Sequence, residues 1–238
     1  MTAFELKAVK FKSLVKKNYD LIPEGLPRPT HGGFAFTLLG KRKSGKTNLI
    51  CNMILSGYAK AFDSIIILNS TVFLDPTWES LKEAKRANNY FFDKVTNFTL
   101  LNILQKQKET YLDNPKKSAT LLVLDDAGNF FCAKEAKKFV DISYSTARQY
   151  NCSILCSVQS VNMLTGLQLS NTQYWAIWSL DGKASKKIAD DLSYHLTPRQ
   201  FEQLLQKATQ KKYEFLYVYP EADEDKDIFK RNFTEDFT

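Results

Sequence analysis

Residues 40–47 read GKRKSGKT, and this segment constrains the fold more than any other part of the chain. It satisfies the pattern GxxxxGK[ST] at every required position. It also lies between an apolar run at residues 34–39 and a stretch with helical spacing at residues 47–56. A loop that joins a buried strand to a helix turns successive backbone N–H groups inward, toward the positive N-terminal end of the helix. The segment therefore predicts a phosphate-binding loop (P-loop) flanked by a strand and a helix.

The residue types of this loop suit the phosphates of a nucleoside triphosphate. The Lys46 ammonium would neutralise the β and γ phosphates, and the Thr47 hydroxyl would bind Mg²⁺. We therefore expect ATP and Mg²⁺ as cofactors. The residues expected to contact the nucleotide are Gly40, Lys41, Arg42, Lys43, Ser44, Gly45, Lys46, Thr47 and Asn48.

Apolar runs recur along the chain and alternate with stretches of helical spacing. Continuous apolar strands separated by helices are typical of a parallel sheet that is covered on both faces, so we expect an α/β fold. Strands are expected at residues 34–39, 64–68, 119–124, 153–158, 174–180 and 213–219. Helices are expected at residues 47–56, 77–87, 98–112, 134–148, 183–192 and 197–208.

One large domain accounts for most of the 238 residues, because a chain of this length can bury a full core. Residues 1–33 contain several prolines and glycines, and we expect an extension that packs on the core or on a neighbouring subunit. Residues 34–220 would form the domain that carries the P-loop. Residues 221–238 form an acidic tail, which we expect to be disordered or to lie on a neighbouring subunit.

Charge and cysteine usage add two weaker expectations. Lys and Arg exceed Asp and Glu by 33 − 26 = 7, which fits a polyanionic partner and equally fits a solvated lysine-rich surface. No apolar run approaches the roughly 20 residues that a membrane span needs. Three cysteines lie in apolar surroundings and predict buried thiols in a reducing, cytoplasmic compartment: Cys51, Cys152 and Cys156.

Residues 121–126 read LLVLDD, an apolar strand that ends in two carboxylates. If this strand lies next to the P-loop strand, Asp125 would lie beside the Mg²⁺ that Thr47 binds. Asp126 would then lie within reach of the attacking water, as its base or its orienting group. The alternative interpretation is that the two aspartates merely open a turn, which Gly128 and Asn129 would favour.

Two further polar residues flank the strand expected at residues 153–158. Gln159 follows the strand, and side chains at the carboxyl ends of such strands face the ligand crevice, so it would sense the γ-phosphate or merely end the strand. Arg148 ends the preceding helix. A cation is favourable there in its own right, and the alternative is an arginine finger that reaches a neighbouring subunit's nucleotide.

The order of these segments resembles the viral genome-packaging ATPases of the poxvirus type, which belong to the FtsK–HerA superfamily. That family combines a P-loop, a strand ending in two acids, and an Arg-x-x-Asn-x-Ser block followed by a strand that ends in Gln. The resemblance covers roughly residues 34–180. The third block is represented here by Arg148, Asn151, Ser153 and Gln159.

The resemblance implies a RecA-like ATPase that assembles into a ring, expected to be a hexamer, and drives double-stranded DNA into a preformed capsid. Capsid or vertex proteins would be partners, and the protein would act at the assembly site in the host cytoplasm and be carried in the virion. By the same likeness, Lys46 and Thr47 bind nucleotide and Mg²⁺, and Asp125 holds Mg²⁺. Asp126 would activate water, and Arg148 would act across subunits.

One departure from the family concerns the segment after the Gln strand, where members often carry an arginine shortly before an asparagine. Residues 169–172, LSNT, offer Asn171 but no arginine.

Contacts with DNA phosphates would come from lysines on loops, without reading bases. The candidates are Lys116, Lys117, Lys134, Lys137 and Lys138, although a solvated surface is the favoured interpretation of each.

Two other functions share the P-loop. A nucleoside or nucleotide kinase would also need an arginine-rich lid over the donor phosphates, and residues 160–200 contain only Arg199 and several lysines. A nucleotide-gated scaffold protein would hydrolyse slowly and move nothing. Phosphate transfer distinguishes the first from a motor, and stimulation of turnover by DNA distinguishes the second.

Overall fold

The computed structural model describes residues 18–29, 32–84, 88–94, 96–126, 134–192 and 196–237, without the side chains of residues 18, 134–137 and 226. An eight-stranded sheet runs through the molecule in the order β3-β2-β4-β5-β1-β6-β7-β8. The strands from β3 to β6 are parallel, and β7 and β8 are antiparallel additions at one edge. The strands are β1 Ala35–Leu39, β2 Ser64–Leu68, β3 Asn89–Phe92, β4 Thr120–Leu124, β5 Cys152–Val158, β6 Tyr174–Ile177, β7 Leu216–Val218 and β8 Phe229–Arg231.

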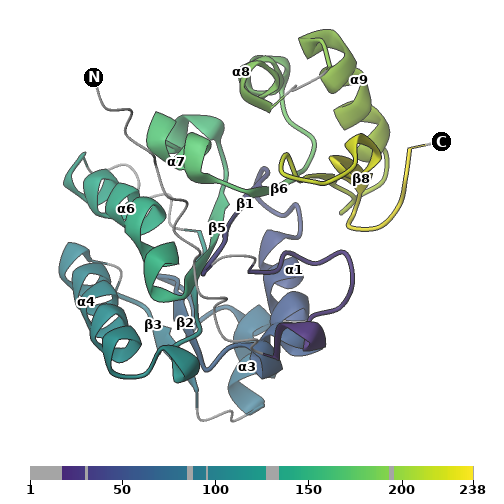
Figure 1. Ribbon diagram of the computed structural model, residues 1–238. Helices are drawn as coiled ribbons and strands as arrows, with labels where there is room; N and C mark the ends of the chain where they lie inside the picture. The colour runs from purple at the N-terminus through teal and green to yellow at the C-terminus, as the bar shows by residue number, and fades with distance from the viewer. Residues whose placement is uncertain are drawn as a thin grey trace, which may run out of the picture.

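Helices cover both faces of this sheet, with α4 and α6 on one face and α1 and α3 on the other (Figure 1). The helices α8 and α9 continue the first cover over β7. This arrangement is the expected RecA-like α/β fold. The helices are α1 Lys46–Met53, α2 Ala59–Ala61, α3 Glu79–Glu83, α4 Asn97–Asp113, α6 Lys134–Thr146, α7 Gly166–Asn171, α8 Gly182–Leu192 and α9 Pro198–Ala208.

Short helical turns join these elements, and one of them extends α1. The π-helical turn η2, Ile54–Tyr58, carries the predicted helix on to α2. The other turns are η1 Asn18–Leu21, η3 Pro76–Trp78, η4 Pro115–Lys117, η5 Ala147–Tyr150, η6 Val161–Met163 and η7 Asp225–Asp227.

Local sequence explains most of these elements. Every residue of β1, β4 and β5 is buried, as continuous apolar runs predict for central strands of a covered sheet. At α9, Thr197 and Gln200 form a capping box and Pro198 occupies the first turn. The predicted burial of Cys51, Cys152 and Cys156 is confirmed, and Cys132 lies outside the described residues. Of the helices described, none is long and apolar enough to cross a membrane.

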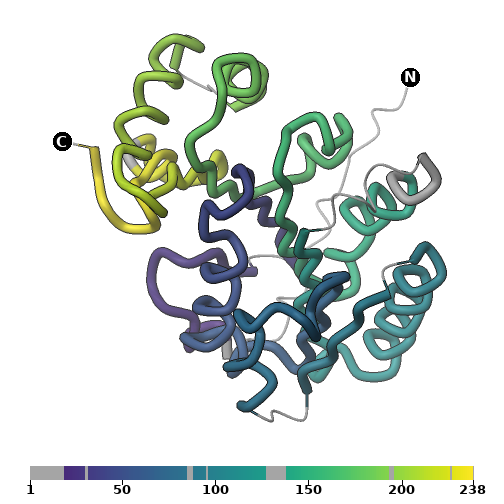
Figure 2. The backbone as a smooth tube through the Cα atoms, turned by 180° about the vertical axis from the view of Figure 1, so that it is seen from behind, coloured from purple at the N-terminus to yellow at the C-terminus, as the bar shows by residue number. Residues whose placement is uncertain are grey.

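The C-terminal segment differs from the expected tail. Instead of a disordered or swapped segment, its residues 229–231 form β8, which pairs with β7 and completes the sheet. Its aromatic residues explain this, since the Phe233 ring packs against the rings of Phe215 and Tyr217, at 5.1 and 5.2 Å between centroids. The segment returns beside α9 (Figure 2). The sequence also did not predict β3 and α7, which are too short to show a clear hydrophobic period.

Residues 18–29, in the described part of the N-terminal extension, pack on the core of their own chain. Ile22 is buried in the core. The hydroxyl of Tyr58 donates to the Pro27 carbonyl at 2.9 Å, and the hydroxyl of Tyr174 donates to the Arg28 carbonyl at 3.1 Å. Residues 1–17 lie outside the described residues.

Candidate functional site

The predicted P-loop connects β1 to α1, at the carboxyl end of a central strand. Gly45 has φ 100°, a left-handed conformation that favours glycine, and it directly precedes the first turn of α1. At Gly40, an added Cβ would lie 2.9 Å from the Trp178 Cβ atom, so a larger residue would collide with the strand-end tryptophan. Both glycines of the motif are therefore required by the shape of the loop.

The Lys46 ammonium lies inside the loop. Its Nζ donates to the carbonyl oxygens of Gly40 at 2.6 Å and Lys41 at 2.9 Å. Burial lowers the pKa of Lys46, against the opposing effect of the Asp125 and Asp126 carboxylates. The side chain is thus folded into the loop, in a site where its charge is weakly screened.

The side chains of Thr47 and Asp125 are in contact, although the strands that precede them, β1 and β4, are not neighbours in the sheet. The Thr47 hydroxyl donates to Asp125 Oδ2 at 2.9 Å. The condition of adjacent strands, on which this pairing was predicted, is not met, because β5 lies between β1 and β4. The gap is two inter-strand spacings, about 10 Å, and the loop and first turn of α1 span it. The predicted pairing of the two residues therefore holds through the helix rather than through strand adjacency.

Asp125 is enclosed by hydrogen-bond donors that sequence reasoning missed. It is 1% exposed, and it accepts from the amide Nδ2 of Asn69 at 2.9 Å and from the hydroxyl of Ser157. Burial raises the pKa of this carboxyl, while the bonds from Ser157, Thr47 and Asn69 act to lower it. Asn69 follows the end of β2, so the strand-end rule applied to Gln159 could have identified it. Ser157 lies inside a buried strand and gave no signal.

Asp126 and Gln159 also touch each other. The Gln159 amide Nε2 donates to Asp126 Oδ1, and the backbone N–H of Asp126 donates to the Ser157 hydroxyl at 3.1 Å. Asp126 has φ 46°, a strained conformation for a residue other than glycine, and its side chain is exposed. The second acid thus points to solvent while the first is buried, which fits the two different roles predicted for them.

A cavity of about 430 Å³ opens at this loop. Of the residues predicted to contact nucleotide, six line it, whereas Gly40, Lys41 and Arg42 do not. Four residues that sequence reasoning missed complete the lining: Asp75, Thr77, Lys212 and Tyr213. The expected strand at residues 213–219 begins only at Leu216, because Tyr213 lies in a turn with φ 74°.

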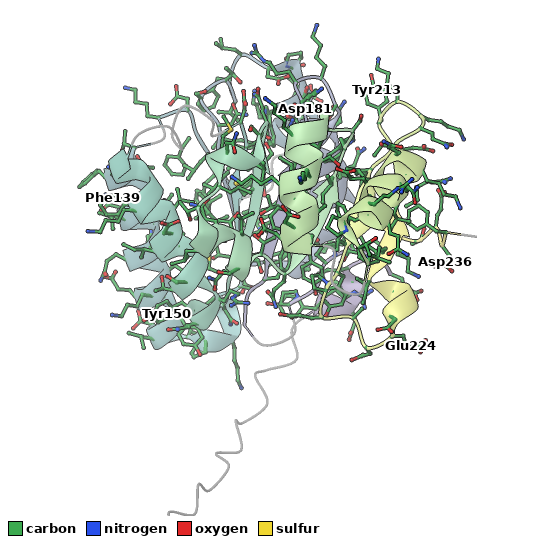
Figure 3. All side chains as sticks on the ribbon, turned by 90° about the horizontal axis from the view of Figure 1, so that it is seen from above. Phe139, Tyr150, Asp181, Tyr213, Glu224 and Asp236 are labelled. Atoms are coloured by element: carbon green, nitrogen blue, oxygen red, sulfur yellow. The ribbon has the colours of Figure 1, made fainter. Side chains whose placement is uncertain are left out.

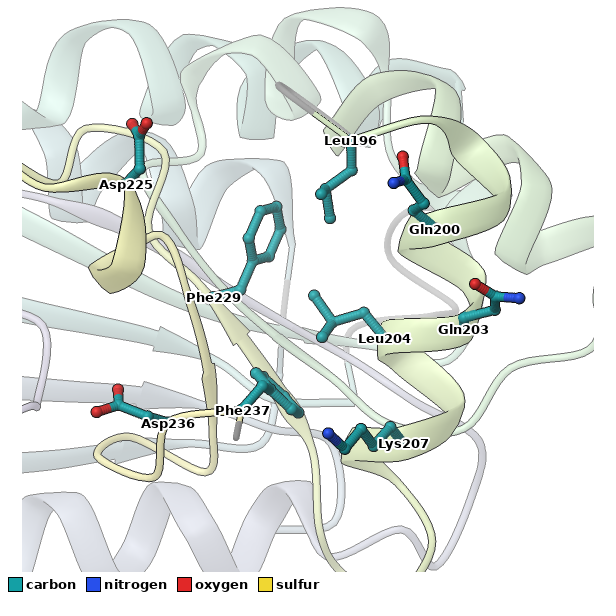
Figure 4. A pocket seen from close by; sticks show the side chains of 9 residues that line it. All are labelled: Leu196, Gln200, Gln203, Leu204, Lys207, Asp225, Phe229, Asp236 and Phe237. Atoms are coloured by element: carbon teal, nitrogen blue, oxygen red, sulfur yellow. The ribbon is translucent and has the colours of Figure 1, made fainter.

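Another cavity, with a volume of about 570 Å³, lies between α9 and the C-terminal segment. It shares no lining residue with the cavity at the P-loop. Leu204, Phe229 and Phe237 project into it from opposite walls (Figure 4). Its lining is largely apolar and offers no P-loop, so it does not suit a triphosphate.

The structure keeps Arg148 apart from the other predicted site residues. Its carbonyl accepts from the Gly33 N–H at 3.2 Å, so η5 lies at the amino-terminal edge of the sheet. The P-loop follows the other end of β1, five residues or about 17 Å away. Figure 3 shows Tyr150, in the same turn as Arg148, on the side of the molecule opposite Tyr213 at the P-loop cavity. Arg148 therefore cannot reach the P-loop of its own chain.

The lysines predicted to contact DNA are also dispersed. Lys116 and Lys117 are exposed on η4, which Asn151 connects to η5 by donating from Nδ2 to the Pro115 carbonyl at 3.1 Å. Lys138 is exposed on α6, and the side chains of Lys134 and Lys137 lie outside the described residues. Asn171 ends α7, where its amide donates to the Leu167 carbonyl of the same helix.

Comparisons with known proteins identify the fold. No family model matches the chain, and no curated protein sequence matches it. Among solved structures, the DNA-packaging ATPase B204 from Sulfolobus turreted icosahedral virus is 15% identical, with a TM-score of 0.61 over 85% of this chain and 98% of that one. The B204 genome-packaging NTPase of Sulfolobus turreted icosahedral virus 2, in complex with ATP-gammaS, is 17% identical, with a TM-score of 0.58 over 86% and 98%.

The same fold occurs in secretion ATPases. The cytoplasmic domain of the Thermomonospora curvata type VII secretion ATPase EccC is 13% identical, with a TM-score of 0.58. The match covers 86% of this chain and 26% of that protein. At these identities the likeness establishes a shared fold. Neither activity nor cargo follows from it.

Proposed function

We propose that this protein is an ATP-hydrolysing motor of the viral genome-packaging type within the FtsK–HerA superfamily. The observation that carries the proposal is the hydrogen bond of 2.9 Å from the Thr47 hydroxyl to Asp125. It joins the P-loop to the acidic strand end, as the binding of a metal-bound triphosphate between them requires. The contact of Gln159 with Asp126 would complete one side of a hydrolytic site.

The donor set suits Mg²⁺. A threonine hydroxyl and a carboxylate are hard oxygen ligands, and Mg²⁺ binds through few protein ligands together with phosphate oxygens and water. In the part of the chain that the structure describes, no cluster of three or more His, Cys, Asp or Glu side chains offers an all-protein metal site. Thr47 and Asp125 would hold the ion, which neutralises charge on the phosphates.

The chain's own groups would then perform the remaining roles. Lys46 would exchange its bonds to the Gly40 and Lys41 carbonyls for bonds to phosphate oxygens. Asp126, exposed at the strand end, would orient or deprotonate the attacking water. Gln159 donates to Asp126, and its amide would register whether the γ-phosphate is present.

The coupling to DNA is the second part of the proposal. We infer a homo-oligomeric ring, a hexamer by the resemblance, in which Arg148 acts at a neighbouring subunit's P-loop. Its position at the opposite edge of the sheet supports action between chains. The net charge of +7 supports contact with double-stranded DNA, independent of base sequence. Capsid or vertex proteins in the host cytoplasm, where virions assemble, would be the further partners.

The kinase interpretation loses support from the segment where a lid would occur. Within residues 160–200, the described residues form η6, α7, β6 and α8, and β6 pairs with β1 in the sheet. A strand fixed in the sheet is not available to close over phosphates. No comparable structural observation opposes the scaffold interpretation, and the rate of ATP hydrolysis with and without DNA tests it.

The deciding experiment measures phosphate release by the purified protein, with and without double-stranded DNA. We expect DNA to stimulate hydrolysis, and the stimulation to decline steeply with salt concentration. Lys46→Ala should reduce hydrolysis on the order of 100-fold or more, and Lys60→Ala, an exposed lysine of α2, should not. Phosphate transfer to nucleosides without DNA-sensitive hydrolysis would establish the kinase, and slow turnover indifferent to DNA would establish the scaffold.

A further inference from the structure

The cavity at the P-loop extends past the phosphate-binding residues. Besides the loop, its walls come from Asp75 and Thr77, in the segment after β2, and from Lys212 and Tyr213, in the turn between α9 and β7. Its volume of about 430 Å³ lies within the range of pockets that enclose whole small molecules. A triphosphate group bound by the loop would leave the part of the cavity near Tyr213 open.

Tyr213 is fixed beside the loop by its backbone. It has φ 74°, and its carbonyl accepts from the Trp178 indole N–H at 3.2 Å. Its Cδ1 atom lies 3.1 Å from the position that a Cβ on Gly45 would occupy. A side chain at residue 45 would therefore force the ring to shift by a few tenths of an ångström. The positive φ of Tyr213 is uncommon for a residue other than glycine, and such residues cluster at functional sites.

The ring of Tyr213 nevertheless remains open to solvent. The side chain is 55% exposed although it is packed at the loop, and Figure 3 shows it at the rim of the molecule. The Lys212 ammonium lies 4.7 Å from the ring centroid, in the geometry of a cation–π contact. An exposed aromatic ring with a cation beside it, next to a phosphate-binding loop, is suited to contact the base of a nucleotide whose phosphates lie in the loop.

We propose that Tyr213 forms the base subsite of this nucleotide site, an inference that rests on the proposed function. The base of the bound nucleoside triphosphate stacks on the Tyr213 ring while its phosphates occupy the P-loop. Lys212 adds positive charge at the same mouth of the cavity. Stacking depends on the area of the base and not on its hydrogen-bonding edge, so purines bind more tightly than pyrimidines and adenine is not distinguished from guanine by this contact.

The test compares two probes that differ in the base. Binding of a non-hydrolysable ATP analogue and of inorganic tripolyphosphate is measured by calorimetry on wild type, Tyr213→Ala and Tyr213→Phe. Tyr213→Ala should weaken binding of the ATP analogue by about 5- to 150-fold and leave tripolyphosphate binding unchanged. Tyr213→Phe should bind both probes as wild type does. Tyr90→Ala, which removes an exposed tyrosine of β3, serves as the matched control.

The outcomes separate this inference from the proposed function. Equal weakening of both probes in Tyr213→Ala would mean that the ring shapes the loop and binds no base, which overturns the inference. Unchanged binding of both probes would overturn it as well. If wild type and Lys46→Ala fail alike to bind either probe, the proposed nucleotide site itself is wrong. A preference for purine over pyrimidine triphosphates that shrinks in Tyr213→Ala would support stacking.

Discussion

The carboxyl edge and the amino edge of the parallel sheet both carry residues of the predicted motifs, but these residues make different kinds of contact at the two edges. At the carboxyl edge, the Thr47 hydroxyl donates a hydrogen bond to Asp125, and the Gln159 amide donates one to Asp126. At the amino edge, the Asn151 amide donates to the Pro115 carbonyl and to the Ser118 hydroxyl, both in its own subunit's framework. One edge therefore gathers reactive groups, and the other uses its polar side chains to hold loops together.

Arg148 is the exception at the amino edge. Its side chain is half-buried, and among the described residues no side-chain partner is found for it. Its neighbours Asn151 and Ser153 are both engaged, Ser153 by accepting from the Phe34 N–H at 3.1 Å. The comparison shows that a single chain brings Thr47, Asp125, Asp126 and Gln159 together at one edge of the sheet, while Arg148 lies at the other edge.

The largest effect should come from Arg148→Ala. If the guanidinium stabilises phosphoryl-transfer charge in a neighbouring subunit, hydrolysis by the assembled protein should fall roughly 10³-fold or more. Binding of an ATP analogue should remain within about twofold of wild type, since Arg148 cannot reach the P-loop of its own chain. Phosphate release and calorimetry measure the two quantities.

Mixed assemblies sharpen this prediction. Subunits with Arg148→Ala mixed with subunits with Lys46→Ala should recover some hydrolysis, because some interfaces then pair an intact arginine with an intact P-loop. Arg199→Ala, which removes an exposed arginine of α9, is the control. Absence of recovery in assemblies shown to mix would count against action between subunits.

A smaller effect should come from a pair of asparagines, one at each edge. Asn69, at the carboxyl edge, donates to Asp125 at 2.9 Å and so orients the carboxylate expected to bind Mg²⁺. Asn69→Ala should therefore raise the Mg²⁺ concentration needed for half-maximal hydrolysis about 10- to 100-fold.

The amino-edge partner of this pair is Asn88, whose amide donates to the Phe62 carbonyl at 3.3 Å. Asn88→Ala should leave the Mg²⁺ dependence as in wild type, and both variants should be checked for folding by thermal denaturation. Similar Mg²⁺ dependences for the two variants would remove the distinction between the edges.

The smallest effect, one on stability alone, should come from Asn151. Loss of its two amide bonds removes the hydrogen bonds that connect η5 to the Pro115 carbonyl and the Ser118 hydroxyl, and alanine also tolerates its φ of 57° poorly. Asn151→Ala should lower the free energy of unfolding by about 1–3 kcal/mol, and Asn151→Gly by less, because glycine accepts the backbone conformation. Urea denaturation measures both. A loss of ATP affinity in the folded variants would show that the amino edge also serves its own nucleotide site.

Prediction from the sequence succeeded where the signal is local. The strand at residues 64–68 coincides with β2, and α4 and α8 each begin one residue before their predicted starts. Prediction failed for segments with few apolar residues, whose structure depends on packing against residues distant in the sequence. The packing of Phe233 explains why residues 229–231 join the sheet, and nothing within residues 221–237 indicates the partner rings.

The sequence by itself determined the P-loop, because the turn, the cation and the hydroxyl that bind phosphates all lie within eight consecutive residues. It also determined the acid pair as the end of a buried strand. Only the tertiary structure decided that β5 separates these strands, that Asn69 and Ser157 enclose Asp125, and that Tyr213 meets Gly45. The reason is physical: periodicity encodes which face of an element is buried, whereas contacts between distant elements depend on strand order and packing.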